Sequence, residues 1–198
     1  MLVFWDAKLV FLAVPKTGTT ALEGALAPRA SMVLRDPPIL KHCPTYRYQR
    51  LVEPFLKKAG DVELETLAVV RNPIDWLGSW YRYRHRDDLV GHPNSTRGIS
   101  FDTFVEHYAE GNSKPYAAVG SQAKFVLKDD GNSNVSHLFK YEAQDLLRRF
   151  LEDRLSVSFE PKRLNVSPQI ELNLTSSVES KLRHSCENEF RAWELAQG

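Results

Sequence analysis

The chain has 198 residues, of which 42% are hydrophobic and 26% are charged, and its 26 Lys and Arg residues against 25 Asp and Glu residues leave a net charge of +1. This composition excludes a disordered or collagen-like chain, and the near-neutral charge argues against a dedicated nucleic-acid-binding protein. Because a domain averages roughly 150 residues, we expect one domain over residues 1–198. The two cysteines, Cys43 and Cys186, can form at most one disulfide and do not suggest a zinc site.

No segment of the sequence is expected to cross a membrane. The longest apolar run, Leu9–Val14, is far shorter than the ~18 residues that a spanning helix needs. The first residues carry neither the basic region nor the small-residue cleavage site of a signal peptide, so we expect a cytoplasmic protein. A chain trimmed of an N-terminal anchor would have the same sequence, and that alternative stays open.

Strands and helices are predicted to alternate along the chain. Short apolar, β-branched runs predict strands at residues 8–14, 31–34, 64–70 and 135–141. Apolar residues spaced three and four apart predict helices at residues 21–26, 44–59, 73–84, 101–108 and 143–155, and a last helix from residue 176. This alternation, with strands that are apolar throughout, indicates an α/β fold in which helices cover both faces of a parallel sheet.

Three of the predicted helices carry further signals. The apolar side of the helix at 44–59 is expected to consist of Tyr48, Leu51, Val52, Phe55 and Leu56. Ser100 is the expected N-cap of the helix at 101–108. The last helix begins at Ser176 with Glu179 three residues on, the spacing of a capping box. Its apolar stripe is expected to consist of Val178, Leu182, Cys186, Phe190 and Trp193.

The loop Pro15–Thr20 lies between a buried strand and the start of a helix. In that position the free N–H groups and the dipole of the helix favour an anion. Gly18 allows the backbone to come close to a ligand, and Lys16 adds a positive charge. The loop is shorter than the G-x-x-x-x-G-K-[ST] loop of ATP-binding proteins, which suits one phosphate-like group better than a metal-bound triphosphate. The alternative is a plain turn with an exposed lysine.

A second basic group follows the third predicted strand. Arg71 stands at its carboxyl end, the edge at which parallel sheets bind ligands, and its guanidinium suits a phosphate. Ser79 lies two helical turns further on and could add a hydroxyl from the same side. Pairing of Arg71 with Asp75 is the alternative.

Together these segments resemble the sulfotransferase superfamily. The phrase Phe11-Leu-Ala-Val-Pro-Lys-Thr-Gly-Thr-Thr20, followed by Val70-Arg-Asn-Pro73 and Ser79, is similar to bacterial members related to the Golgi carbohydrate sulfotransferases. The resemblance implies a three-layer fold like that of P-loop NTPases, with a central parallel sheet flanked by helices. It also implies 3′-phosphoadenosine 5′-phosphosulfate (PAPS) as the sulfuryl donor and no need for a metal ion.

The resemblance also implies roles for individual residues. The 5′-phosphosulfate is expected to bind to the loop residues Pro15, Lys16, Thr17, Gly18, Thr19 and Thr20. Arg71 and Ser79 are expected to bind the 3′-phosphate. Asn165 and Ser167 match a family loop that approaches the nucleotide, although a simple turn bounded by Pro168 explains them equally well. During transfer, Lys16 is expected to stabilise the negative charge that develops on the departing oxygen.

The acceptor must lose a proton, which calls for a neutral base. His42 follows the second predicted strand in Lys41-His42-Cys43, a stretch similar to related bacterial sequences, and we assign it as the general base. Some members of the family use a glutamate, which leaves Glu23 as an alternative. Cys43 is interpreted as a small buried thiol rather than a nucleophile.

The sequence says less about the acceptor. Residues 86–100 and 111–122 form loops long enough to cover one. The basic run Arg82, Arg84 and Arg86 could attract a sulfated or phosphorylated glycan, or could be a solvated helix end. We expect a glycan or a small molecule that offers a hydroxyl or an amine.

Two other functions stay open. One is a nucleotide-dependent kinase on the same architecture, against which the missing Gly-Lys-Ser/Thr order argues. The other is a non-catalytic module that binds a nucleotide or a glycan.

Overall fold

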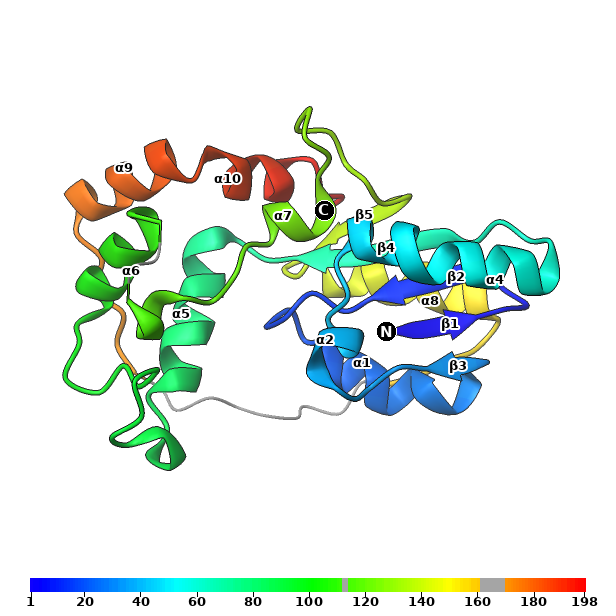
Figure 1. Ribbon diagram of the computed structural model, residues 1–198, viewed down its shortest axis with the longest axis horizontal. Coiled ribbons are helices and arrows are strands. Elements are labelled where there is room, and N and C mark those ends of the chain that lie inside the picture. The colour runs from blue at the N-terminus through cyan, green and yellow to red at the C-terminus, as the bar shows by residue number, and fades with distance from the viewer. Residues whose placement is uncertain (112–113, 161–169) are drawn as a thin grey trace.

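The computed structural model describes residues 1–111, 114–160 and 170–198. Its centre is a five-stranded sheet with the strand order β3-β1-β2-β4-β5, and helices lie on both of its faces (Figure 1). The strands are β1 (Leu2–Phe4), β2 (Leu9–Leu12), β3 (Met32–Val33), β4 (Glu65–Val70) and β5 (His137–Lys140). The predicted α/β class is therefore confirmed.

The sheet is mixed, whereas the sequence predicted a parallel one. Strands β2, β4 and β5 are parallel, but β1 runs antiparallel to both β2 and β3. The strand Leu2–Phe4 was not predicted, because three apolar residues are too short to show a period. A tight turn joins it to β2, with the N–H of Lys8 donating to the carbonyl of Trp5 at 3.0 Å. A connection this short permits only an antiparallel pair, since parallel neighbours need a long crossover.

Ten α-helices are described, some of only one turn. They are α1 (Thr19–Leu26), α2 (Pro38–Lys41), α3 (Thr45–Arg47), α4 (Glu53–Gly60), α5 (Pro73–Arg84), α6 (Phe101–Ala109), α7 (Ala123–Val126), α8 (Gln144–Leu155), α9 (Ser176–Ser185) and α10 (Glu187–Glu194). A π-helical stretch, Tyr48–Val52, links α3 to α4, and 3₁₀ turns cover Ala27–Arg29, Asp87–Leu89 and Pro115–Ala117.

Alternate strand residues serve the two faces of the sheet. Val10 and Leu12 pack toward the π-helical stretch, α4, α7 and α10, whereas Leu9 and Phe11 pack toward α1 and α8. This period of two is what a strand buried on both faces requires. Because β2 and β4 are parallel, the helices that follow them start at the same edge of the sheet.

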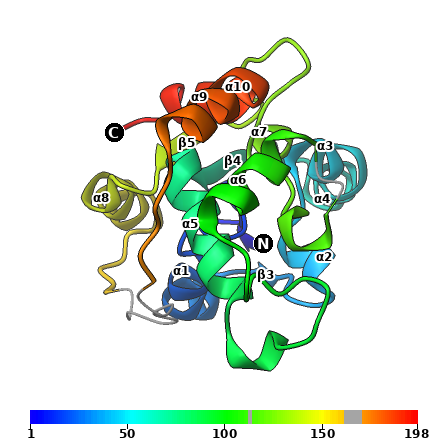
Figure 2. The ribbon, with the colours of Figure 1, turned by 90° about the vertical axis from the view of Figure 1, so that its left-hand side faces the viewer.

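A second, helical half stands beside this edge. Helices α5, α6, α9 and α10 enclose their own apolar core, in which Trp76 meets Tyr108 edge to face at 6.1 Å between ring centroids. Figure 2 shows α9 and α10 lying across α5 and α6. Helix α5 is the link between the halves, because only two residues separate it from β4 and its buried face belongs to the helical core.

The helix predicted at residues 44–59 exists, but its predicted apolar side is wrong in part. Tyr48 and Leu56 are buried, yet Leu51 and Phe55 are 61% and 62% exposed. The reason is the π-helical stretch, whose wider turn changes the angular positions of the residues that follow. Tyr48, Val52 and Leu56, spaced four apart, stay on the buried side, whereas Leu51 and Phe55 turn away from it.

The last predicted helix begins at Ser176 as expected but is broken at Cys186. There the backbone leaves the helical region, so that α9 and α10 are separate helices. Thr175, not Ser176, occupies the N-cap, and its hydroxyl donates to Asp102 at 2.8 Å instead of capping the helix. At the start of α6, the expected cap is confirmed, since the Ser100 hydroxyl accepts from the N–H of Thr103 at 3.1 Å.

Both cysteines are unpaired. Cys43 is buried as expected, and burial raises the pKa of its thiol. Within residues 1–111, 114–160 and 170–198, no helix is both long and apolar enough to cross a bilayer.

The exposure of Leu51 gives a direct test of the π-helical register. Leu56→Ala, at a 3% exposed position, should lower the free energy of unfolding by about 2–5 kcal/mol. Leu51→Ala, on the same helical segment, should change it by less than about 0.5 kcal/mol, because its side chain is already in water. Urea denaturation measures both values. Equal losses would show that Leu51 is buried and that the described register is wrong.

Candidate functional site

The loop after β2 has an unusual backbone. Lys16 and Gly18 have φ angles of +66° and +74°, while Thr17 between them does not. For a lysine, the left-handed region costs about 1–2 kcal/mol, and such strain is often kept for function. Alternation of this kind can turn successive N–H groups toward one side to form an anion-binding concavity. The backbone N–H groups of Lys16, Thr17 and Gly18 have no hydrogen-bond partner among the described residues.

Neighbouring groups hold this loop in place. The Thr17 hydroxyl donates back to the carbonyl of Val14 at 2.9 Å, so it serves the loop itself rather than facing outward. From α5, the buried Trp76 donates its indole N–H to the carbonyl of Pro15 at 2.9 Å. The loop is therefore attached to both halves of the molecule, on either side of Lys16.

The end of β4 is held just as firmly. The side-chain amide of Gln122 accepts from the N–H of Arg71 at 2.8 Å and donates to its carbonyl at 2.9 Å. The next N–H, that of Asn72, donates to Glu142 at 2.8 Å. The Asn72 side chain then caps α5 by accepting from the N–H of Ile74 at 3.0 Å. The backbone that carries Arg71 thus has a fixed path.

Tyr141 brings the loop and Arg71 together. The Arg71 guanidinium lies over the ring of Tyr141, 4.6 Å from its centroid. A Cβ atom built on Gly18 would come within 3.0 Å of the same ring, so the loop passes directly against it. The alternative pairing of Arg71 with Asp75 is not found among the described ion pairs, and the buried Nε of Arg71 has no hydrogen-bond partner there.

Lys16 lies among other cations. Its ammonium is 4.1 Å from the ring centroid of Tyr83, and the guanidinium of Arg86 lies over that ring at the same distance. Burial, followed by repulsion from Arg86, Arg71 and Arg82, lowers the pKa of Lys16 to about 8. No described carboxylate forms an ion pair with Lys16, Arg71 or Arg82. This is the electrostatic environment of an anion site.

The predicted basic run Arg82, Arg84 and Arg86 does not act as one surface. Arg84 is buried and donates to the carbonyls of Pro115 and Ala118 at 2.7 and 2.8 Å. Arg82 on α5 and Arg86, two residues beyond the end of that helix, lie on the side of Lys16. Burial and the charge of Arg71 lower the pKa of Arg82. These two arginines were not assigned to the loop from the sequence.

His42 lies at the base of the loop. Its Nδ1 is 2.7 Å from the carbonyl of Ala13, an oxygen that can only accept, so Nδ1 carries the proton and Nε2 the lone pair. Burial lowers the pKa of His42, outweighing the opposite effect of this hydrogen bond. The imidazole is therefore neutral at pH 7 with one nitrogen ready to accept a proton. This bond holds the imidazole against Ala13, three residues before Lys16, but no contact between the side chains of His42 and Lys16 is recorded among the described residues.

Glu23 is less suited to be the base. It accepts from Arg35 at 2.5 Å and from Lys41 at 2.9 Å. Burial opposes ionisation of Glu23, but the hydrogen bonds from Lys41 and Arg35 outweigh it and lower the carboxyl pKa. A carboxylate held in two ion pairs is a weak proton acceptor.

The other predicted site residues differ in their positions. Ser79 is buried on α5, and its hydroxyl makes no hydrogen bond to another described residue. Thr19 is buried and Thr20 is exposed in the first turn of α1. Asn165 and Ser167 lie outside the described residues.

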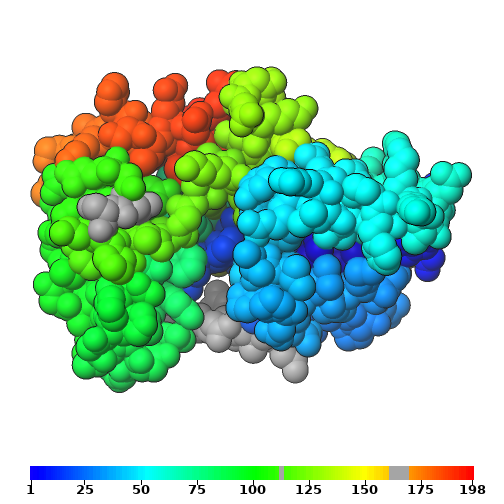
Figure 3. All heavy atoms as spheres, viewed as in Figure 1, coloured from blue at the N-terminus to red at the C-terminus, as the bar shows by residue number. Residues whose placement is uncertain are grey.

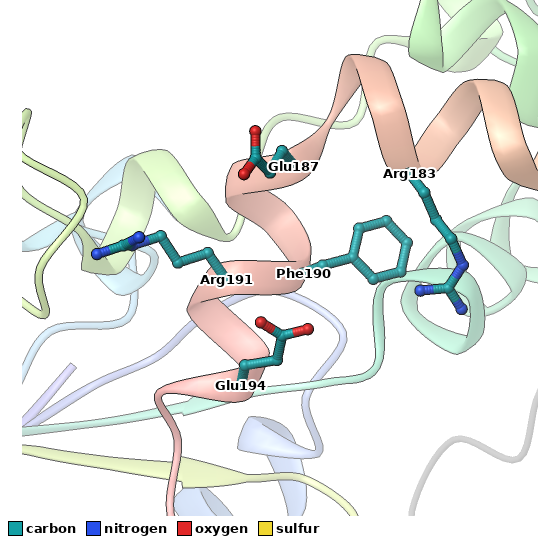
Figure 4. Close-up of a pocket in the computed structure, with 5 residues that line it drawn as sticks. All are labelled: Arg183, Glu187, Phe190, Arg191 and Glu194. Carbon is teal, nitrogen blue, oxygen red and sulfur yellow. The ribbon is translucent and has the colours of Figure 1, made fainter.

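Figure 3 shows a hollow between the green atoms of the helical half and the blue atoms of the sheet half, with N-terminal residues at its floor. Two other depressions lie near the C-terminal helices. One, of about 300 Å³, is lined by Arg183, Glu187, Phe190, Arg191 and Glu194 (Figure 4). Arg191 donates there to the carbonyl of Gly131 at 2.6 Å, and Arg183 lies over Phe190, so both cations are already engaged. The second, of about 1000 Å³, is bordered by Tyr108, Lys124 and Cys186.

Comparison of the chain with models of known protein families, with curated proteins and with solved structures finds no match. Function is therefore inferred from the residues and contacts described above.

The low pKa of Lys16 predicts how the site responds to an anion. In nuclear magnetic resonance titrations, one lysine should titrate near pH 8, and its pKa should rise when sulfate is added. Only the charged ammonium attracts the anion, so sulfate affinity should fall as the pH rises through about 8. Sulfate itself does not titrate in this range, which isolates the effect of the protein.

Lys16→Arg is the control, because it keeps the charge and should remove this titration. A Lys16 resonance that titrates in the ordinary range, with no response to sulfate, would contradict the described environment.

Proposed function

We propose that the protein is a sulfotransferase that uses PAPS as donor and has a P-loop-like site at the edge of its sheet. The observation that carries this proposal is the gathering of Lys16 and Arg71, from two distant segments, around Tyr141 and Gly18 without a carboxylate to neutralise them. The donor has an anionic group at each end of its ribose, which matches two cationic positions rather than one.

The residues present fit the two ends of such a nucleotide. On one side, the guanidinium of Arg71, which no carboxylate pairs with, and the nearby charge of Arg82 suit a 3′-phosphate, and Ser79 on α5 is the proposed hydroxyl donor. Opposite them, the N–H groups of the strained loop and the Lys16 ammonium are available to the 5′-phosphosulfate. Charge-assisted hydrogen bonds of this kind are roughly twice as strong as neutral ones.

The same residues support sulfuryl transfer. When bound, the donor supplies the sulfuryl group and a 5′-phosphate leaving group. Lys16 stabilises the negative charge that grows on the oxygen leaving sulfur, which favours the transition state over the ground state. His42 accepts the proton of the attacking hydroxyl or amine at Nε2, the nitrogen that the bond to Ala13 leaves unprotonated. A glycan or small molecule entering the hollow of Figure 3 is the proposed acceptor.

Donor binding can be tested before the acceptor is known. Adenosine 3′,5′-bisphosphate should bind to the protein in calorimetric titrations, and ATP, which lacks the 3′-phosphate, should bind at least tenfold more weakly. Lys16→Ala and Arg71→Ala should each weaken binding of the bisphosphate by roughly 10–100-fold, the value of one hydrogen bond to a charged group. Lys58→Ala and Arg149→Ala, at exposed positions far from the loop, are the matched controls.

Tighter, magnesium-dependent binding of ATP would favour a kinase over a sulfotransferase. Equal effects of the site variants and the exposed controls would remove the proposed nucleotide site altogether.

The base is tested by His42→Ala. Transfer of labelled sulfuryl groups from PAPS to a panel of hydroxyl acceptors should slow by about 10²–10⁴-fold, while affinity for adenosine 3′,5′-bisphosphate stays within about twofold. Since burial lowers the pKa of His42, the acidic limb of the wild-type pH–rate profile should lie below the ordinary histidine value of 6.5. His92→Ala, in an exposed loop, is the control. Normal turnover by His42→Ala would eliminate this base, and tight nucleotide binding without transfer to any acceptor would indicate a non-catalytic module.

A further inference from the structure

Gln122 reaches Arg71 from outside the sheet. Its side-chain amide pairs with both the N–H and the carbonyl of Arg71, at 2.8 and 2.9 Å, in the way that a neighbouring strand would. Gln122 is fully buried. Because Arg71 follows the last residue of β4, this pairing replaces a sheet contact at the position where the strand gives way to α5.

The position of Gln122 is itself fixed by α10. The carboxylate of Glu189 accepts from the N–H of Gln122 at 3.1 Å and from the N–H of Ala123 at 3.3 Å. Its other oxygen accepts from the hydroxyl of Ser121. Glu189 is buried, and with these three donors around it the carboxylate has no freedom to move without leaving a buried group unpaired. A continuous hydrogen-bonded path therefore leads from α10 to Arg71.

The Arg71 side chain contrasts with its backbone. The backbone has both polar groups satisfied by Gln122, whereas the guanidinium lies over Tyr141 with its Nε unpartnered. No described carboxylate orients this guanidinium, so its direction depends on the backbone from which it projects and on the ring beneath it. A small displacement of that backbone would carry the guanidinium away from its phosphate, and placement errors of this kind are costly in binding sites.

We propose that Gln122 is a positioning residue that holds Arg71 for recognition of the 3′-phosphate, and that Glu189 holds Gln122 in turn. This inference rests on the proposed nucleotide site. It predicts that loss of Gln122 weakens recognition of the 3′-phosphate and leaves recognition of the 5′-phosphate unchanged.

The test uses the full chain, with adenosine 3′,5′-bisphosphate and AMP as probes. Gln122→Met preserves the length of the side chain but removes both hydrogen bonds to Arg71. We expect the affinity for the bisphosphate to fall about tenfold, while the affinity for AMP, which has only the 5′-phosphate, stays within about twofold. Leu151→Ala, a buried change on the opposite face of the sheet, should lower stability and leave the ratio of the two affinities intact.

A double-mutant cycle separates positioning from general damage. In the Arg71→Ala background, Gln122→Met should lower the affinity for the bisphosphate by less than twofold, because the guanidinium that Gln122 positions is already gone. Should Gln122→Met fail to fold, Glu189→Gln tests the same path one step earlier and should produce a smaller but equally selective loss.

Each outcome has a distinct meaning. Equal losses of affinity for AMP and the bisphosphate, or a full additional loss in the Arg71→Ala background, would overturn the positioning role alone. A wild-type protein with no preference for the bisphosphate over AMP would overturn the nucleotide site itself and the positioning role with it.

Discussion

The structure depends on keeping several cations close together without a carboxylate between them. Burial and the charges of neighbouring arginines, Arg71 among them, lower the pKa of Lys16 and of Arg82. Aromatic rings lie against these cations, with Tyr83 in contact with Lys16 and Arg86 and Tyr141 beneath Arg71, while Arg86 also pairs with Asp88 at 3.1 Å. Contacts of this kind contribute less than a full ion pair in a buried setting. Under the proposed function, a bound anion would relieve this repulsion.

The two halves of the molecule contribute different parts of this arrangement. The sheet half supplies the strained loop and the end of β4, while α5 supplies Arg82 and the two rings that face Lys16, and Arg86 follows the end of α5. Trp76 joins the halves at the loop, and Gln122 joins them at Arg71. Because the connecting groups are backbone-directed hydrogen bonds from buried side chains, the relative position of the cations follows from the packing of the two cores.

The elements of the fold could largely be predicted from sequence, because burial imposes its periods on the chain. The strand that ends before Arg71 was found from its apolar run because every residue from Thr66 to Val70 is buried. The strand Leu2–Phe4 was missed because it is too short, and with it the mixed direction of the sheet. The exposure of Leu51 and Phe55 was missed because a π-helical turn leaves no mark in a pattern based on a 3.6-residue period.

The sequence likewise predicts some residues of the candidate site and misses others. Lys16, Arg71 and His42 stand in local patterns beside strand ends, where charge and position can be read together. Gln122 is a neutral amide without a motif, and its partner Arg71 is distant in the sequence, so only the tertiary fold reveals it.

The proposal that Lys16 and Arg71 bind the two ends of one nucleotide is best tested by a crystal structure of the protein with adenosine 3′,5′-bisphosphate. We predict that the 3′-phosphate contacts Arg71 and that the 5′-phosphate contacts Lys16 and the N–H groups of its loop. A nucleotide bound elsewhere, with neither cation touching a phosphate, would contradict it.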